Sequence, residues 1–126
     1  MEKQVKPGLK YTFLVHFVVA LIFGLGFLLI PGTFGQLFNW PVLDPPTYRL
    51  LGAAFLGYAT SSILAYRETA WEKVIIVVRM EIIWAGLATL VLLWGLIFSG
   101  LPAIGWLFAA IFAAFTAAFS IFYNPA

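Results

Sequence analysis

The sequence predicts an all-α, polytopic membrane protein in which four transmembrane helices form one bundle. Its composition is 63% hydrophobic and only 10% charged, whereas soluble domains average about 25% charged residues. Four long apolar runs fill almost the whole chain, at residues 11–30, 46–66, 74–98 and 102–123. A helix needs about 20 apolar residues to cross a hydrocarbon core ~30 Å thick. Little chain remains outside the runs, so residues 1–126 are expected to form a single transmembrane domain.

The first run follows a basic tail, as the apolar part of a secretory signal does. Its length of about 20 residues exceeds the roughly 7–15 that are typical of a signal. It also ends in Ile30-Pro31-Gly32-Thr33, which is no small-x-small cleavage site. We therefore expect this run to be the first transmembrane span.

The first connection contains a pattern for a short helix. Thr33 and Gln36 have the spacing of a capping box, in which each side chain satisfies a backbone donor of the other. Phe34, Leu37 and Phe38 would then share one side of the helix. Such a segment is expected to lie in the outer membrane interface with its aromatic side in the lipid. A plain loop is the alternative.

Asp44 and Pro45 mark the start of the second span. An aspartate at the N-cap and a proline at the first helical position are both favoured at helix starts.

The distribution of basic residues predicts the orientation of the chain in the membrane. The N-terminal tail carries Lys3, Lys6 and Lys10, and the second connection carries Arg67 and Lys73. By the positive-inside rule these segments are cytoplasmic. Four spans then place both termini inside, in a multi-pass protein of the cell inner (plasma) membrane. The three lysines are expected to bind acidic lipid headgroups. Nucleic acid is not an expected partner, because the basic residues flank spans instead of forming a patch.

Small residues repeat at four-residue spacing in the predicted spans, and such rows allow helix backbones to approach closely in lipid. The rows are His16, Ala20 and Gly24 in the first span, Ala53, Gly57, Ser61 and Ala65 in the second, and Gly105, Ala109, Ala113 and Ala117 in the fourth. The fourth span has a further alanine row beside this one. It therefore either packs between two neighbours or forms an interface with another copy or another membrane subunit.

Three ionisable residues lie well inside the predicted spans, and a charge at the centre of a span costs about 2.5–3.5 kcal/mol. At 1.5 Å per residue, His16 lies about 9 Å beyond the cytoplasmic end of its span. Arg79 lies at about the same depth and Glu81 about 3 Å deeper. The second span places Ser61 and Ser62 in this slab, with Tyr58 slightly deeper.

Two accounts of this polar level remain open. In one, Glu81 and His16 form a buried pair, lined by the second span, that takes part in proton or cation handling. In the other, Arg79 extends to the cytoplasmic headgroups and Glu81 accepts hydrogen bonds that only fix how the helices pack. Arg79 and Glu81 are two positions apart and point to different sides of the helix, so they do not neutralise each other.

Arg49 is a second candidate, one turn into the second span at its outer end. It is expected either to contact Asp44 or a lipid headgroup, or to form an outer anion site.

Several chemistries lack the residues they need. The chain has no cysteine and a single histidine, which leaves no thiol nucleophile, no disulfide and no cysteine or histidine metal set. No HxxxxD motif or serine–histidine pairing supports a lipid-modifying enzyme. We expect no enzymatic activity and no cofactor.

The stretch from Arg49 through Gly57, continuing over Leu64-Ala65-Tyr66-Arg67, resembles the second span of small DoxX-like four-helix bacterial membrane proteins. The resemblance covers roughly residues 45–90 and implies a four-helix architecture without a defined activity. We therefore expect a non-enzymatic integral membrane protein that is an oligomeric or accessory subunit of a membrane complex. The alternative is a small ion or solute channel or transporter that uses the polar level around Glu81 and His16.

Overall fold

The computed structural model describes residues 2–126, and this part of the chain is all-α. Its helices are α1 (Pro7–Leu29), α2 (Pro31–Leu37), α3 (Pro45–Tyr66), α4 (Trp71–Phe98) and α5 (Gly105–Ile121). Three of them begin with proline, whose missing N–H has no partner in the first turn in any case. Residues 2–126 contain no strand, and a single isolated bridge joins Gln4 to Ala70.

The helix boundaries differ from the predicted spans mostly at their N-terminal ends. α1 begins at Pro7 and α4 at Trp71, each earlier than predicted, because their polar first turns are helical as well. α5 begins later than residue 102, at Gly105. The carbonyl of Pro102 accepts a hydrogen bond from the Gly105 N–H at 2.8 Å, so a tight turn occupies the predicted first turn of the helix.

Two helices are long and apolar enough to cross a membrane by length and composition, α1 with 23 residues and α4 with 28. α5 is apolar but shorter, with 17 residues. α3 has 22 residues, and its two prolines, its arginine and its hydroxyl-bearing residues lower its hydropathy. Helix length and composition therefore support two membrane-crossing candidates among the described residues.

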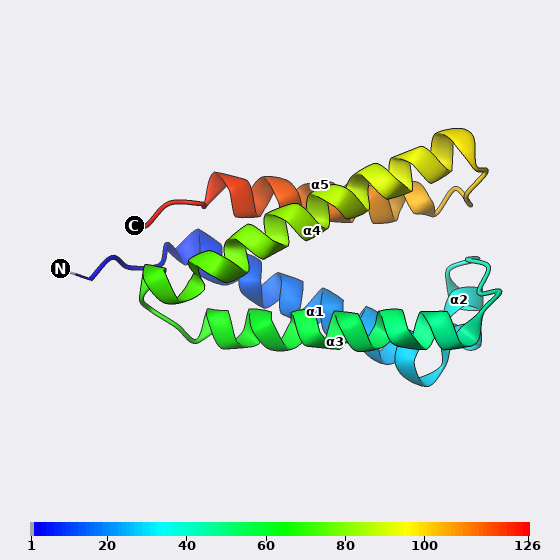
Figure 1. Ribbon diagram of the computed structural model, residues 1–126, viewed down its shortest axis with the longest axis horizontal. Helices are drawn as coiled ribbons and strands as arrows, with labels where there is room; N and C mark the ends of the chain where they lie inside the picture. Colours follow the sequence, from blue (N-terminus) through cyan, green and yellow to red (C-terminus); the bar gives the residue numbers. More distant parts are fainter. Residues whose placement is uncertain (1) are drawn as a thin grey trace.

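The four long helices form two antiparallel hairpins (Figure 1). α1 packs closely against α3, and α4 packs closely against α5, whereas the contacts between the hairpins are fewer. The hairpins meet where both termini lie and diverge toward the end that carries α2 (Figure 1). The bundle is thus tightly closed at one end and looser at the other.

Gly52 determines how closely α3 approaches α1. A Cβ atom at this position would lie 2.5 Å from the backbone nitrogen of Leu28 and 2.8 Å from the carbonyl oxygen of Gly24. Only glycine fits between two backbones at such a distance. Gly24, in the row predicted for the first span, is the matching residue on α1.

The row predicted for the second span was wrong in its first half. Ala53 and Gly57 are exposed, and a Cβ at Gly57 would meet no atom within 4 Å. Ala65, at the other end of the row, is buried together with Gly52, Ala59 and Ser62. Both sides of this helix contain small residues, so residue size alone does not indicate which side packs.

The short helix α2 is present in the first connection, but its start and its orientation differ from the prediction. Its N-cap is Ile30, and it has no side-chain capping bond, so the proposed capping box of Thr33 and Gln36 does not form. Phe34 is buried against Phe27, with ring centroids 5.1 Å apart. The aromatic side of α2 therefore packs on α1 instead of entering the lipid.

Hydrogen bonds from the N-terminal tail stabilise the closed end of the bundle. The Val5 N–H donates to the Thr69 carbonyl at 2.9 Å, and the Trp71 N–H donates to the Lys3 carbonyl at 2.8 Å. These bonds join the tail to the connection between α3 and α4. Beneath them lies a core of fully buried side chains: Leu9, Phe13, Val74, Val78 and Phe119.

Candidate functional site

A buried polar cluster, Glu81–His16–Ser62, joins three helices at the centre of the bundle. The His16 Nε2 atom of α1 lies 3.0 Å from the Glu81 Oε2 atom of α4. Its Nδ1 atom lies 2.7 Å from the Ser62 hydroxyl of α3. Glu81 and Ser62 are fully buried and His16 is 5% exposed. The cluster is thus the polar link between the two hairpins.

The contact between His16 and Glu81 is close but not well aligned. Oε2 lies within ion-pair distance of Nε2, yet its geometry does not meet that of a hydrogen bond, and Oε1 has no partner among residues 2–126. Glu81 therefore depends on His16 alone for electrostatic compensation. A fully buried carboxylate without its counter-charge is strongly unfavourable.

Two arrangements of protons give the Glu81–His16 pair no net charge. Either His16 is an imidazolium beside a Glu81 carboxylate, or a protonated Glu81 faces a neutral imidazole at Nε2. In both arrangements Nδ1–H donates to the Ser62 oxygen, because the other ring nitrogen faces Glu81. The two differ only by one proton moved between Nε2 and Oε2. In either arrangement the pair carries no net charge into its apolar surroundings.

Aromatic rings enclose the cluster on the α5 side. The His16 ring meets Phe115 edge-on with centroids 4.8 Å apart, and it lies 5.8 Å from the Phe119 ring. On the side of the closed end, Phe13 and Val78 are fully buried. Apolar side chains thus surround the polar groups, which strengthens the interactions among them.

The other residues predicted for the polar level lie outside this cluster. The Ser61 hydroxyl donates to the Tyr58 carbonyl of its own helix at 2.9 Å. Arg79 is exposed, and its Nε atom donates to the Tyr123 hydroxyl at 2.5 Å. This geometry agrees with the expectation that Arg79 and Glu81 point to different sides of α4. The Tyr58 ring packs against the Trp84 ring, with centroids 4.8 Å apart.

Arg49 has a partner that the sequence did not indicate. Its Nη1 atom donates to the Leu28 carbonyl at 3.0 Å, near the C-terminal end of α1. The predicted ion pair with Asp44 is not formed, and Asp44 instead accepts a hydrogen bond from the Thr47 hydroxyl. A cation at a helix C-terminus is favourable, since the last carbonyls lack intrahelical partners. Arg49 therefore fastens α3 to the end of α1.

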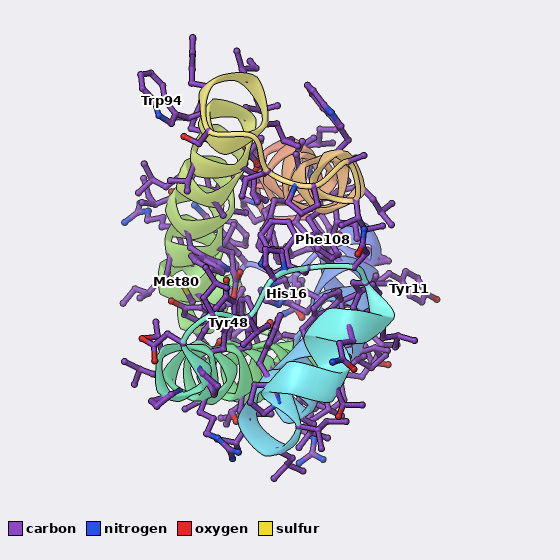
Figure 2. The ribbon with its side chains drawn as sticks, turned by 90° about the vertical axis from the view of Figure 1, so that its right-hand side faces the viewer. Tyr11, His16, Tyr48, Met80, Trp94 and Phe108 are labelled. Atoms are coloured by element: carbon purple, nitrogen blue, oxygen red, sulfur yellow. The ribbon has the colours of Figure 1, made fainter. Side chains whose placement is uncertain are left out.

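A second feature, an aromatic cavity between the hairpins, was missed from the sequence. It has a volume of about 200 Å³, its lining is almost entirely carbon, and His16 is part of its wall. In a view from the α2 end, His16 lies in the middle of the bundle, between Tyr48 and Phe108 (Figure 2). The aromatic residues that line it are Phe23, Phe27, Trp40, Tyr48, Phe55, Tyr58, Trp84, Phe108, Phe112 and Phe115. The signal in the sequence is the high aromatic content of 18%, but only the pairing of the helices brings these rings together.

Metal ligands do not gather in this part of the chain. Within residues 2–126, no three His, Cys, Asp or Glu side chains lie close enough together to hold a metal ion. The features that remain are the buried Glu81–His16–Ser62 cluster and the aromatic cavity.

Comparison with known proteins finds no matching family model, no matching curated protein and no matching solved structure.

Proposed function

We propose that this chain is a four-span integral protein of the inner membrane, with both termini in the cytoplasm, that acts as a non-enzymatic subunit of a membrane assembly. The exposed side chains support membrane insertion. On α1 an exposed apolar stripe repeats every three to four residues, at Val15, Val18, Ile22, Leu25 and Leu29. On α4 the exposed residues include Ile76, Val91 and Phe98, each at least 67% exposed. Apolar surfaces of this extent are unfavourable in water and favourable in lipid.

The proposed role as a subunit rests on one observation. The outer face of the α4–α5 hairpin contains a groove. Gly86, Ala113 and Ala117 contribute small side chains to it, and Ile83, Leu87 and Leu90 contribute large ones. A Cβ at Gly86 would meet only the Thr116 methyl group, at 3.8 Å, so the site is open. Small residues on an exposed helix face permit close packing by another transmembrane helix.

A second copy of the chain is the occupant that this groove fits best. The groove and the large residues beside it lie on the same face of the hairpin. In the proposed dimer a two-fold axis through this face places the large residues of one copy against the small residues of the other. The fourth-span alanines that do not pack inside the monomer, Ala110, Ala113, Ala114 and Ala117, are exposed on this helix.

Replacing Gly86 with leucine is expected to weaken self-association at least about tenfold, or about 1.4 kcal/mol. The Cβ of the new side chain meets only the Thr116 methyl group, at an ordinary contact distance, and the longer side chain occupies the groove. Gly57→Leu is the control, because Gly57 is an exposed helical glycine outside the groove and has no atom near its Cβ position. Native mass spectrometry from mild detergent and subunit-exchange energy transfer in liposomes measure the dimer fraction. A monomeric wild-type protein, or equal effects of both substitutions, would contradict the proposal.

The alternative, a channel or transporter that uses Glu81 and His16, has one favourable observation, the buried contact between these two ionisable side chains. The apolar residues around the cluster favour the subunit role, because ion conduction needs a polar or hydrated path. The resemblance of residues 49–67 to DoxX-like proteins stays a prediction and implies no activity.

A further inference from the structure

We propose that the aromatic cavity between the hairpins is a binding site for an uncharged, lipid-soluble ring compound that carries a hydrogen-bonding oxygen, as a phenol does. This inference goes beyond the subunit role, since it concerns a partly open cavity within one chain and does not require self-association. Three features support it: the volume of the cavity, the aromatic side chains that line it, and the hydroxyl group of Tyr48 near the α2 end.

The size of the cavity sets the size of the guest. Its volume is about 200 Å³. An engineered apolar cavity of about 150 Å³ in another protein stays dry and binds benzene. A cavity of this kind is a poor site for water, because a buried water needs two to four polar partners. The volume thus suits one aromatic ring with a few additional atoms.

The walls of the cavity favour a planar and uncharged molecule. Phe23 and Phe108 of opposite hairpins meet edge-on with centroids 5.6 Å apart, and Trp84 and Phe112 meet at 5.5 Å on α4 and α5. Aromatic rings attract further rings in stacked or edge-on geometry. His16 contributes a basic group to the lining, and both of its ring nitrogens already face Glu81 and Ser62. A charged guest would therefore find no counter-charge.

Tyr48 supplies a hydrogen-bonding group for the guest. Its hydroxyl oxygen accepts a hydrogen bond from the Trp40 indole N–H at 3.1 Å, and both residues line the cavity. Because Tyr48 accepts in this bond, its own O–H proton is free to donate to a second oxygen. The Tyr48 ring packs on Phe27, with centroids 5.4 Å apart, near the α2 end of α1. The ring of such a guest would pack against the aromatic walls, and its oxygen would accept a hydrogen bond from the Tyr48 hydroxyl.

Binding of 4-fluorophenol to the protein in lipid nanodiscs, followed by ¹⁹F NMR, tests this proposal. We expect a saturable bound signal above that of empty nanodiscs, and no such signal for the charged 4-fluorobenzenesulfonate. Leu92 lines the cavity, whereas its neighbour Val91 is 70% exposed. Leu92→Trp is expected to abolish the saturable signal, and Val91→Trp is expected to leave it unchanged.

A second variant keeps the proposal testable if Leu92→Trp does not fold. Tyr48→Phe removes one oxygen atom and is expected to weaken 4-fluorophenol binding about fivefold, while fluorobenzene binds as before. No saturable signal with the wild-type protein, equal binding of the sulfonate, or undiminished binding by folded Leu92→Trp would overturn the site. Unchanged phenol affinity in Tyr48→Phe would overturn the role given to the tyrosine.

Discussion

Replacing His16 with leucine is expected to lower the free energy of unfolding by about 3–5 kcal/mol, the usual effect of removing one partner of a buried ion pair. Glu81 is fully buried, and His16 is the only group within ion-pair distance of its carboxylate among residues 2–126. Without His16, the carboxyl group would remain in an apolar environment with no compensation. Reversible unfolding in mixed detergent micelles, followed by circular dichroism, measures this loss.

The double substitution His16→Leu with Glu81→Met is the informative control. It removes both polar partners and replaces them with apolar groups of similar size, which is often neutral or stabilising for a buried pair. We therefore expect the double variant to regain most of the lost stability. A small effect of His16→Leu alone would contradict the structural role of Glu81–His16–Ser62. The transport alternative instead predicts that Glu81→Gln abolishes proton-coupled flux in liposomes without a comparable loss of stability.

Gly52→Leu is expected to destabilise the protein by more than about 3 kcal/mol, beyond the typical effect of overpacking a core. The obstructing atoms at this position are the backbone of Gly24 and Leu28 on α1. A backbone cannot move aside as a flexible side chain can, so α1 and α3 would have to separate. The same detergent unfolding experiment reports the loss, and the midpoint of thermal unfolding is expected to fall with it.

Gly57→Leu is the matched control on the same helix. Because a Cβ at Gly57 would meet no atom within 4 Å, we expect a change of at most about 0.5 kcal/mol, as for most surface substitutions. Equal effects at the two positions would mean that α3 does not pack on α1 through its Gly52 side. The opposite order of effects would favour the side that carries Ala53 and Gly57, as first predicted from the sequence.

The depth of the polar residues was predictable, whereas their partners were not. Counting residues from the predicted cytoplasmic ends places His16, Ser62 and Glu81 in one slab, because the helix rise is constant. Which of them meet depends on which helices are neighbours and how each is rotated. Arg79 and Ser61 have similar depths but point elsewhere, and only the packing of the helices separates them from His16 and Glu81.

It was harder still to predict whether the apolar side of a helix packs against the protein or faces lipid. Phe34 and Leu37 share one short helix, yet Phe34 is 8% exposed and Leu37 is 75% exposed. Both lipid and protein interior accept apolar side chains, so hydrophobicity alone does not distinguish them. For the same reason the aromatic cavity could not be predicted from the sequence, because its lining residues come from both hairpins. By contrast, Asp44 and Pro45 correctly marked the start of α3, since helix starts depend on local chemistry.

The number of membrane crossings is the claim on which the proposed function depends, and the lack of cysteine in the sequence makes it directly testable. Single cysteines would be introduced at four exposed positions: Gln36, Thr69, Ser99 and Asn124. Labelling with a membrane-impermeant maleimide would then be compared in intact and permeabilised cells. Four spans with both termini inside predict that positions 36 and 99 react in intact cells, and that positions 69 and 124 react only after permeabilisation. Labelling of positions 36 and 69 from the same side, or recovery of the protein in the soluble fraction, would contradict the account.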